Sequence, residues 1–262
     1  MNPNNPAIPL TMTLPRNKVP EVTLYFWIIK ILSTTVGETF ADFLATSLGL
    51  GLVRTSVVMT LLLLVFLTLQ LMRKSYEPWS FWIVVILISV MGTVVTDLCV
   101  DQLGLSLINA TLLFGTLLMV VFFLWYGKEK TLAMKSITSL SRELFYWSAV
   151  LMTFALGTAT GDLLAEKAGL GYGPSAIGFA LAIAMIAFVH HQRWLNGITG
   201  FWLAYILTRP LGASLGDLLS QAPDKGGFGW GPSGTSAMFL STILLLVIFL
   251  TITRKDVFPV SK

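Results

Sequence analysis

Apolar residues dominate this chain in segments close to 20 residues long, which polar or glycine-rich stretches separate. Each segment is long enough to cross the roughly 30 Å of hydrocarbon in a bilayer as an α-helix. Because lipid offers the backbone no hydrogen-bond partners, the pattern predicts an all-α integral membrane protein. The eight predicted transmembrane segments are residues 22–45, 52–72, 79–99, 105–126, 144–165, 174–190, 196–219 and 233–253.

The composition agrees with a membrane protein. Of the 262 residues, 55% are hydrophobic and 11% are charged, whereas soluble domains contain about 25% charged residues. The single cysteine, Cys99, excludes an intramolecular disulfide and a metal site built from several cysteines. The net charge of +4 does not indicate a nucleic-acid partner, because the basic residues lie mainly in the loops.

The basic residues of the loops are distributed unequally between the two sides of the predicted bundle. Only Arg54, Lys167 and Lys225 fall on one side, and twelve fall on the other. Loops rich in Lys and Arg stay in the cytoplasm, so both termini are expected to be cytoplasmic. The twelve are Arg16, Lys18, Arg73, Lys74, Lys128, Lys130, Lys135, Arg142, Arg193, Arg254, Lys255 and Lys262.

The same pattern divides the chain into two halves. Residues 1–20 lack the features of a secretory signal and are expected to be a flexible cytoplasmic tail. Residues 21–126 form the first half, 127–143 a cytoplasmic loop, 144–253 the second half and 254–262 a second cytoplasmic tail.

Four copies of one motif fill the two halves: an aromatic residue and Trp, then Gly ten residues on, then Asp five residues further, then Phe or Leu and a glycine-rich turn. Each copy spans two predicted segments, so all copies enter the membrane from the same side. We therefore expect four parallel two-helix repeats, pseudo-symmetric about an axis normal to the membrane. The motif residues are Trp27, Trp82, Trp147 and Trp202; Gly37, Gly92, Gly157 and Gly212; and Asp42, Asp97, Asp162 and Asp217.

The stretches KVPEVTLYFWIIKILSTTVGETFADFL and TRPLGASLGDLLS, together with the fourfold motif, resemble a family of bacterial integral membrane proteins. That family is built of four tandem two-span repeats of unknown function, each with a characteristic tryptophan. The resemblance covers residues 18–253. It implies the repeat architecture and a location in the bacterial cytoplasmic (inner) membrane, and it implies no activity.

The depth of the acidic residues follows from helix geometry. An Asp 15 residues after a Trp lies about 22 Å further along a helix, near the non-cytoplasmic mouth. Glu38 precedes Asp42 by four residues, so the two share one helix face. Further polar residues lie along the same face in the four copies: Lys30, Thr34, Ser89, Thr93, Thr158 and Arg209.

Ionisable residues at membrane depth usually face the bundle interior or a water-filled cavity. Four repeats around one axis would bring their aspartates together, and mutual repulsion would favour bound protons or a metal ion. Carboxylate and hydroxyl oxygens suit hard cations such as Mg²⁺, Ca²⁺ and Mn²⁺. The expected ligands are the four aspartates and Glu38, with Thr34, Thr93, Thr158, Lys30, Arg209 and the four motif glycines in support.

The sequence therefore predicts a membrane cation transporter for a hard divalent metal ion, with protons as a candidate coupling ion. The divalent cation is cargo, and no cofactor is expected. The lipid bilayer is the expected environment, and nothing indicates a homo-oligomer. The absence of a P-loop, an HExxH motif and a nucleophile–base set argues against an enzyme.

Two other functions stay open at this point. Four parallel repeats with an acidic ring resemble the design of a cation-selective pore. A membrane scaffold or regulator without cargo would instead pair its acids with Lys30, Arg209 or backbone groups.

Individual motif residues also have structural interpretations. The aspartates would be N-caps if each helix broke at its glycine. The tryptophans are expected to be interface anchors, and the glycines are expected to allow close helix packing. Lys30 and Arg209 either neutralise the acids or act as tethered cations that compete with the cargo.

Overall fold

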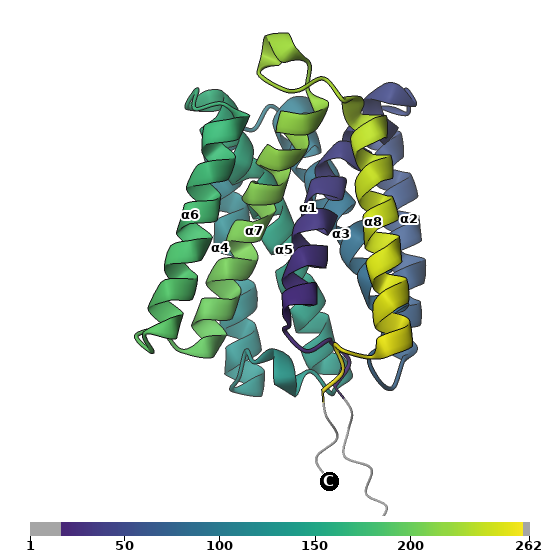
Figure 1. Cartoon of the computed structure of the whole chain (residues 1–262), viewed down its shortest axis with the longest axis vertical. Coiled ribbons are helices and arrows are strands. Elements are labelled where there is room, and N and C mark those ends of the chain that lie inside the picture. Colours follow the sequence, from purple (N-terminus) through teal and green to yellow (C-terminus); the bar gives the residue numbers. More distant parts are fainter. Residues whose placement is uncertain (1–16, 259–262) are drawn as a thin grey trace, which may run out of the picture.

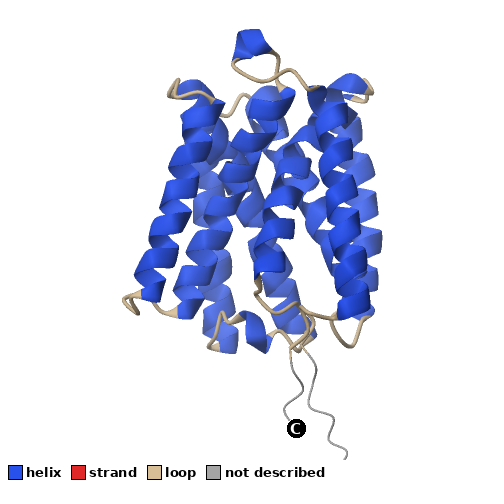
Figure 2. Ribbon diagram, viewed as in Figure 1, coloured by secondary structure: helices blue, strands red, loops and turns tan. Residues whose placement is uncertain are grey.

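The computed structural model describes residues 17–258, which form a bundle of eight long α-helices joined by short connections (Figure 1). Those residues contain no strand (Figure 2). The helices agree with the eight predicted segments to within a few residues. They are α1 (Leu24–Asp42), α2 (Gly51–Met72), α3 (Pro78–Asp97), α4 (Leu107–Glu129), α5 (Leu140–Asp162), α6 (Tyr172–His191), α7 (Gly197–Ser220) and α8 (Gly231–Thr253).

Five short helical turns complete the described secondary structure. Three are π-helical turns, each of which begins directly after a motif aspartate: η1 (Phe43–Ser47), η2 (Leu98–Gln102) and η4 (Leu163–Lys167). The other two are 3₁₀ turns, η3 (Met134–Ser136) and η5 (Pro223–Lys225). The fourth copy therefore differs from the others, since α7 continues past its aspartate without a π turn.

Six helices of the described chain are long and apolar enough to cross a membrane, namely α2, α3, α4, α5, α6 and α8. The chain is therefore a membrane protein. The helices α1 and α7 do not meet the same criterion of length and composition. α1 carries Lys30, Glu38 and Asp42, and α7 carries Arg209 and Asp217.

The odd-numbered helices form a closed inner ring, in which α1 packs on α3, α3 on α5, α5 on α7 and α7 on α1. Each even-numbered helix packs outside the ring on the inner helix that follows it, so α2 covers α3, α4 covers α5 and α6 covers α7. The last helix, α8, returns to cover α1, which lies between α7 and α8 in Figure 1. The inner helices consequently carry most of the buried residues.

The motif glycines are the points of closest approach between neighbouring inner helices. A Cβ placed on any of them would lie 1.9–2.6 Å from a side-chain atom of the next inner helix. The prediction that they allow close packing is confirmed. In every case the contacted residue stands three positions before the next glycine of the ring: Ser89 for Gly37, Phe154 for Gly92, Arg209 for Gly157 and Thr34 for Gly212.

Both ends of the described chain lie at the same end of the bundle, which we call the terminal end (Figure 1). Most motif tryptophans are buried there, with Trp82, Trp147 and Trp202 only 1%, 3% and 4% exposed. The prediction that they anchor the protein at the lipid interface is wrong for these three. They pack instead with the aromatic residues that precede them in the motif, in the largest apolar cluster of the described chain.

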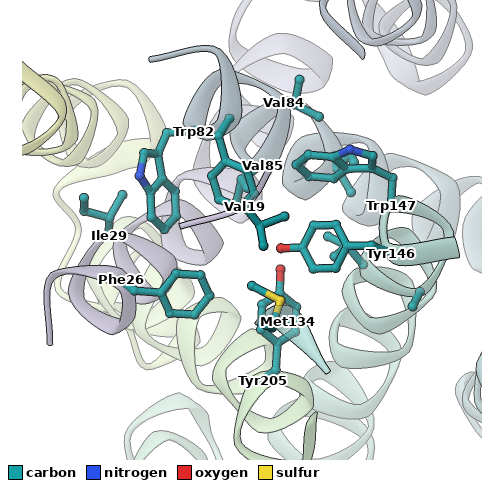
Figure 3. Packing of buried hydrophobic residues seen from close by; sticks show 14 of the residues in the cluster. Val19, Phe26, Ile29, Trp82, Val84, Val85, Met134, Tyr146, Trp147 and Tyr205 are labelled. Atoms are coloured by element: carbon teal, nitrogen blue, oxygen red, sulfur yellow. The ribbon is translucent and has the colours of Figure 1, made fainter. Parts of the chain in front are cut away.

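The residues just before α1 close the terminal end of the ring. Val19 is 1% exposed and lies among Phe26, Trp82 and Tyr146 (Figure 3). Lys18 beside it is held by two acceptors, Glu143 Oε2 at 2.7 Å and Leu71 O at 2.9 Å. The expected flexible tail of residues 1–20 therefore does not extend to residues 17–20, and residues 1–16 lie outside the described range.

Two other predicted boundary segments are also partly structured. The connection 127–143 is shorter than expected, because α4 continues to Glu129 and α5 begins at Leu140. Within the predicted tail 254–262, Asp256 is 1% exposed, while residues 259–262 lie outside the described range. The Tyr76 hydroxyl donates a hydrogen bond to Asp256 Oδ2, and the Glu21 N–H donates to Asp256 O at 2.8 Å. The terminal end is therefore tied together by three separate chain segments.

Candidate cation site

The four motif aspartates lie at the end of the ring opposite the terminal end, which we call the acidic end. Asp42, Asp97 and Asp162 are the last α-helical residues of α1, α3 and α5, and Asp217 lies three residues before the end of α7. The alternative that they cap broken helices is wrong. The first three have helical backbone angles, their side chains make no capping hydrogen bond, and the helix passes unbroken through each motif glycine.

All four aspartates and Glu38 line one cavity of about 190 Å³ at the acidic end. The five carboxylates that sequence reasoning grouped as ligands therefore share one space, although they come from four repeats. The motif spacing accounts for this, because equal distances from glycine to aspartate place the four side chains at one level of the closed ring.

The cavity also contains residues that the sequence analysis missed. Asp101, Glu166 and Gln221 line it, and each stands four residues after a motif aspartate. That spacing is one helical turn on the same face, so the signal was present in the sequence. The π turns that carry the first two extend the polar face beyond the end of each α-helix.

The electrostatics of the cavity are dominated by carboxylates. Seven acidic residues line it, and the described chain offers them one ion pair, between Glu38 Oε2 and Arg209 Nη2 at 3.1 Å. Gln221 contributes one hydrogen bond from its Nε2 to Asp42 Oδ2 at 3.4 Å. A concave surface with one sign of charge raises the local concentration of the opposite ion, and this cavity would act in that way on cations when its carboxyl groups are ionised.

Arg209 closes the axis at the inner side of the cavity. It is 0% exposed, and Nη1 donates to Thr34 O at 2.9 Å. Its Nη2 donates to Thr158 Oγ1 at 2.8 Å and also to Thr93 Oγ1. Since Nη2 reaches Glu38 as well, one side chain of α7 bridges α1, α3 and α5.

The threonines that were expected to support the cation ligands have a different role in this structure. None of them lines the cavity. Thr93 and Thr158 accept hydrogen bonds from Arg209, and the Thr34 hydroxyl donates to Ile31 O at 2.6 Å. They lie one helical turn or more deeper than the aspartates, at the level where the arginine fills the axis.

Lys30 does not neutralise the acids, so that interpretation of its charge is wrong. It is 1% exposed, does not line the cavity, and its Nζ lies 4.1 Å and 4.3 Å from the ring centroids of Phe154 and Tyr205. Glu38 stands eight residues further along α1, about 12 Å at 1.5 Å per residue. Lys30 therefore belongs to the terminal half of the axis.

The arrangement has a clear consequence for metal binding. Within residues 17–258 no group of three or more His, Cys, Asp and Glu residues is placed to hold one metal ion. The carboxylates are spread around the cavity wall instead of converging on one point. A cation in this geometry would keep part of its water shell and contact the carboxylates through it, as Mg²⁺ commonly does.

Comparison with known proteins identifies the repeat itself. The model of a family described as Repeat of Unknown Function (DUF347) matches the chain four times, at residues 25–76, 80–131, 145–193 and 200–256. Each match contains one motif tryptophan, one motif glycine and one motif aspartate. No curated protein and no solved structure matches the chain.

Proposed function

Because the chain belongs to the family of the Repeat of Unknown Function (DUF347) and carries the repeat four times, we propose that its function resides where the four copies meet. The proposed function is that of a membrane cation transporter whose cargo is a hard divalent ion such as Mn²⁺, Mg²⁺ or Ca²⁺. The observation that carries the proposal is the single cavity lined by the four motif aspartates and Glu38.

The proposed topology has eight membrane spans with pseudo-fourfold symmetry about the axis of the ring. The recurring glycine contacts support it, since each copy touches the next at the same pair of positions. The covering of α1 by α8 and of α7 by α6 explains how two charged helices would be tolerated within a bilayer.

The proposed location is the cytoplasmic membrane of a bacterium, with the terminal end in the cytoplasm. Twelve loop and tail basic residues belong to that side in the eight-span arrangement, and this asymmetry supports the orientation. The acidic cavity would then collect cations from the non-cytoplasmic side.

The chemistry of the cavity supports a hard cation over a soft one. Carboxylates and the amide of Gln221 are its polar side chains, and neither cysteine nor histidine lines it. Oxygen ligands suit Mg²⁺, Ca²⁺ and Mn²⁺. Seven carboxylates in one cavity also give protons a natural place as the coupling ion, because protonation relieves their repulsion.

A carrier is favoured over a pore. Arg209 is held by four acceptors at the inner side of the cavity, and the axis beyond it contains Lys30, Phe154 and Val19. A cation crossing the membrane would require these side chains to move, which corresponds to a conformational cycle. A pore would show unitary currents instead.

One observation favours the scaffold as a second candidate. Arg209 pairs with Glu38 and bridges three neighbouring helices, as expected of a purely structural group. The scaffold, however, gives no role to the four aspartates of the cavity, which form no ion pair within residues 17–258.

Purified protein in liposomes tests the proposal. Uptake of Mn²⁺, Mg²⁺ and Ca²⁺ would be measured with a fluorescent indicator inside the vesicles, with and without a pH gradient. Asp97→Asn and Asp162→Asn are each expected to lower the initial rate by roughly tenfold or more, since each removes one charge-assisted contact of about 1.5–3 kcal/mol.

Asp224→Asn is the matched control. It makes the same chemical change at the same end of the molecule, on an exposed turn that does not line the cavity. The control is expected to transport at the wild-type rate. Normal transport by both Asp97→Asn and Asp162→Asn would exclude the proposed site, and the absence of flux in wild-type protein would favour the scaffold.

A further inference from the structure

Four buried polar atoms near the axis, between the acidic cavity and the plugged terminal end, have no hydrogen-bond partner within residues 17–258. They are Lys30 Nζ, Arg209 Nε and the hydroxyls of Tyr146 and Tyr205. None of these residues lines the acidic cavity. Figure 3 shows the two tyrosine hydroxyls directed to the same place at the centre of the ring.

These atoms share one chemical property, which is that all of them can donate. An ammonium group and the Nε–H of a guanidinium group are donors only, and a tyrosine hydroxyl both donates and accepts. A buried donor without an acceptor costs about 1–3 kcal/mol. The two facing hydroxyls can satisfy at most one donor between them, so the ammonium group and the Nε–H still lack an acceptor.

The ion pairs of the two basic residues also indicate a missing acceptor. Arg209 has a carboxylate partner in Glu38. Lys30 has none, since no described Asp or Glu lies within ion-pair distance of its Nζ. Lys30 Nζ and the Arg209 guanidinium carbon lie 4.1 Å and 5.6 Å from the centroid of the same Phe154 ring. The two basic side chains therefore have one carboxylate partner between them.

We propose that these donors form an internal binding site for a small monovalent anion, such as a halide. Lys30 provides the charge, and the hydroxyls of Tyr146 and Tyr205 complete the shell. A ligand at this position would have to be small, because buried Arg209 lies on one side of it and Val19 with the aromatic cluster lies on the other. The π faces of Phe154 and Tyr205 hold the ammonium group in place through cation–π contacts.

The site is independent of the proposed cation transport. Apart from Arg209, which also pairs with Glu38, its residues do not belong to the cation site, and the proposal concerns binding alone. An anion here would stabilise the folded protein, because a ligand that binds only the folded state shifts the unfolding equilibrium.

Thermal unfolding of the purified full-length protein tests the proposal. The melting temperature would be compared in sodium chloride, sodium bromide and sodium gluconate at equal ionic strength. Halide is expected to raise it saturably, by roughly 5–10 °C at a concentration near one hundred times the dissociation constant. Lys30→Met is expected to lose this response, and Lys74→Gln, which removes an exposed lysine at the terminal end, is expected to keep it.

Tyr146→Phe and Tyr205→Phe keep the aromatic rings and remove only the hydroxyls, so they test the site even if Lys30→Met does not fold. Each is expected to weaken the apparent halide affinity by roughly tenfold, the effect of losing one hydrogen bond to a charged group. Crystals grown in bromide should show an anomalous peak between the two hydroxyls and Lys30 Nζ.

Equal melting temperatures in halide and gluconate would overturn the proposal, as would a halide response that persists in folded Lys30→Met. Electron density for an ordered water alone at the donors would also overturn it. Asp97→Asn should keep the full halide response, so a failure of the anion site and a failure of the cation transporter remain distinguishable.

Discussion

The two ends of the inner ring are built from the same four repeats and have opposite chemistry. At the acidic end the repeat places aspartates around a cavity of about 190 Å³. At the terminal end it places tryptophans and their aromatic neighbours in a filled cluster around Val19. One motif therefore specifies both the polar cavity and the apolar cluster, because its aromatic and acidic positions lie at opposite ends of each inner helix.

Midway between the two ends, the four copies do not share one residue type. All four copies carry aspartate at the acidic end, whereas the position three residues before each glycine is Thr34, Ser89, Phe154 or Arg209. A fourfold ring of arginines would repel itself on the axis. One arginine can instead use acceptors from the other three copies, so the separation of the two ends depends on this departure from symmetry.

Replacing Arg209, which lies between the two ends, should have the largest effect on stability. Arg209→Met leaves the Glu38 carboxylate buried without its partner and removes four hydrogen bonds. The expected loss is about 3–5 kcal/mol in the free energy of unfolding, measured by denaturant titration in detergent micelles. Glu38, which lines the acidic cavity, would also lose its only ion pair among the described residues.

The double variant Glu38→Gln/Arg209→Met separates the effect of the unpaired buried carboxylate from the effect of the lost hydrogen bonds. Because it removes both charges, it should recover at least about 1 kcal/mol relative to Arg209→Met. If the double variant is as unstable as Arg209→Met, the buried carboxylate is not the source of the loss.

A smaller effect is expected from the glycine contacts that hold the ring together. In Gly212→Ala the new methyl group would lie 1.9 Å from Thr34 Oγ1 without a shift of the helices. Overpacking of this kind costs about 1–3 kcal/mol. Denaturant titration measures this loss of stability. On heating, α7 should also separate from α1 at a lower temperature than in the wild type, which amide hydrogen exchange would detect.

Gly178→Ala is the control for this variant. Gly178 lies in α6 with open space where a Cβ would stand. Its replacement should change stability by less than about 1 kcal/mol, in the direction of the higher helix propensity of alanine. Equal losses in the two variants would show that the glycine contacts do not determine the stability of the ring.

The sequence predicted the eight helices and the grouping of Asp42, Asp97, Asp162 and Asp217, because both follow from periodic features. Apolar segments near 20 residues define helices, and a fixed spacing within each copy places equivalent residues at equal depth. Asp101 and Glu166 follow the same rule and were missed only because the motif was ended at the aspartate.

Other features depend on tertiary contacts that no periodic pattern in the sequence indicates. The burial of Trp82 results from its place on an inner helix, next to the aromatic residues of neighbouring copies. The pairing of Arg209 with Glu38 joins residues 171 positions apart. The insertion of Val19 depends on how the segment before α1 crosses the ring, whereas the Pro- and Asn-rich composition of residues 1–20 indicated a tail.

The smallest expected effect concerns the closure of the terminal end by Asp256. Burial raises the pKa of this carboxyl above its usual value, although hydrogen bonding from Tyr76 opposes the shift. A carboxyl whose pKa is raised by folding stabilises the folded state fully below its unfolded pKa of about 3.9, and loses that contribution as pH rises through the folded pKa. The attachment of residues 254–258 should therefore weaken from about pH 4 upward, until the carboxyl is fully ionised.

Hydrogen exchange of the segment 254–258 measures this attachment, with the rates corrected for the intrinsic effect of pH. Asp256→Asn cannot ionise and keeps an oxygen that accepts from Tyr76, so its protection should be independent of pH over the same range. Asp224→Asn at the acidic end should retain the wild-type dependence. If wild type and Asp256→Asn have parallel profiles, the closure of the terminal end does not depend on this carboxyl, and the apolar packing around Val19 holds it alone.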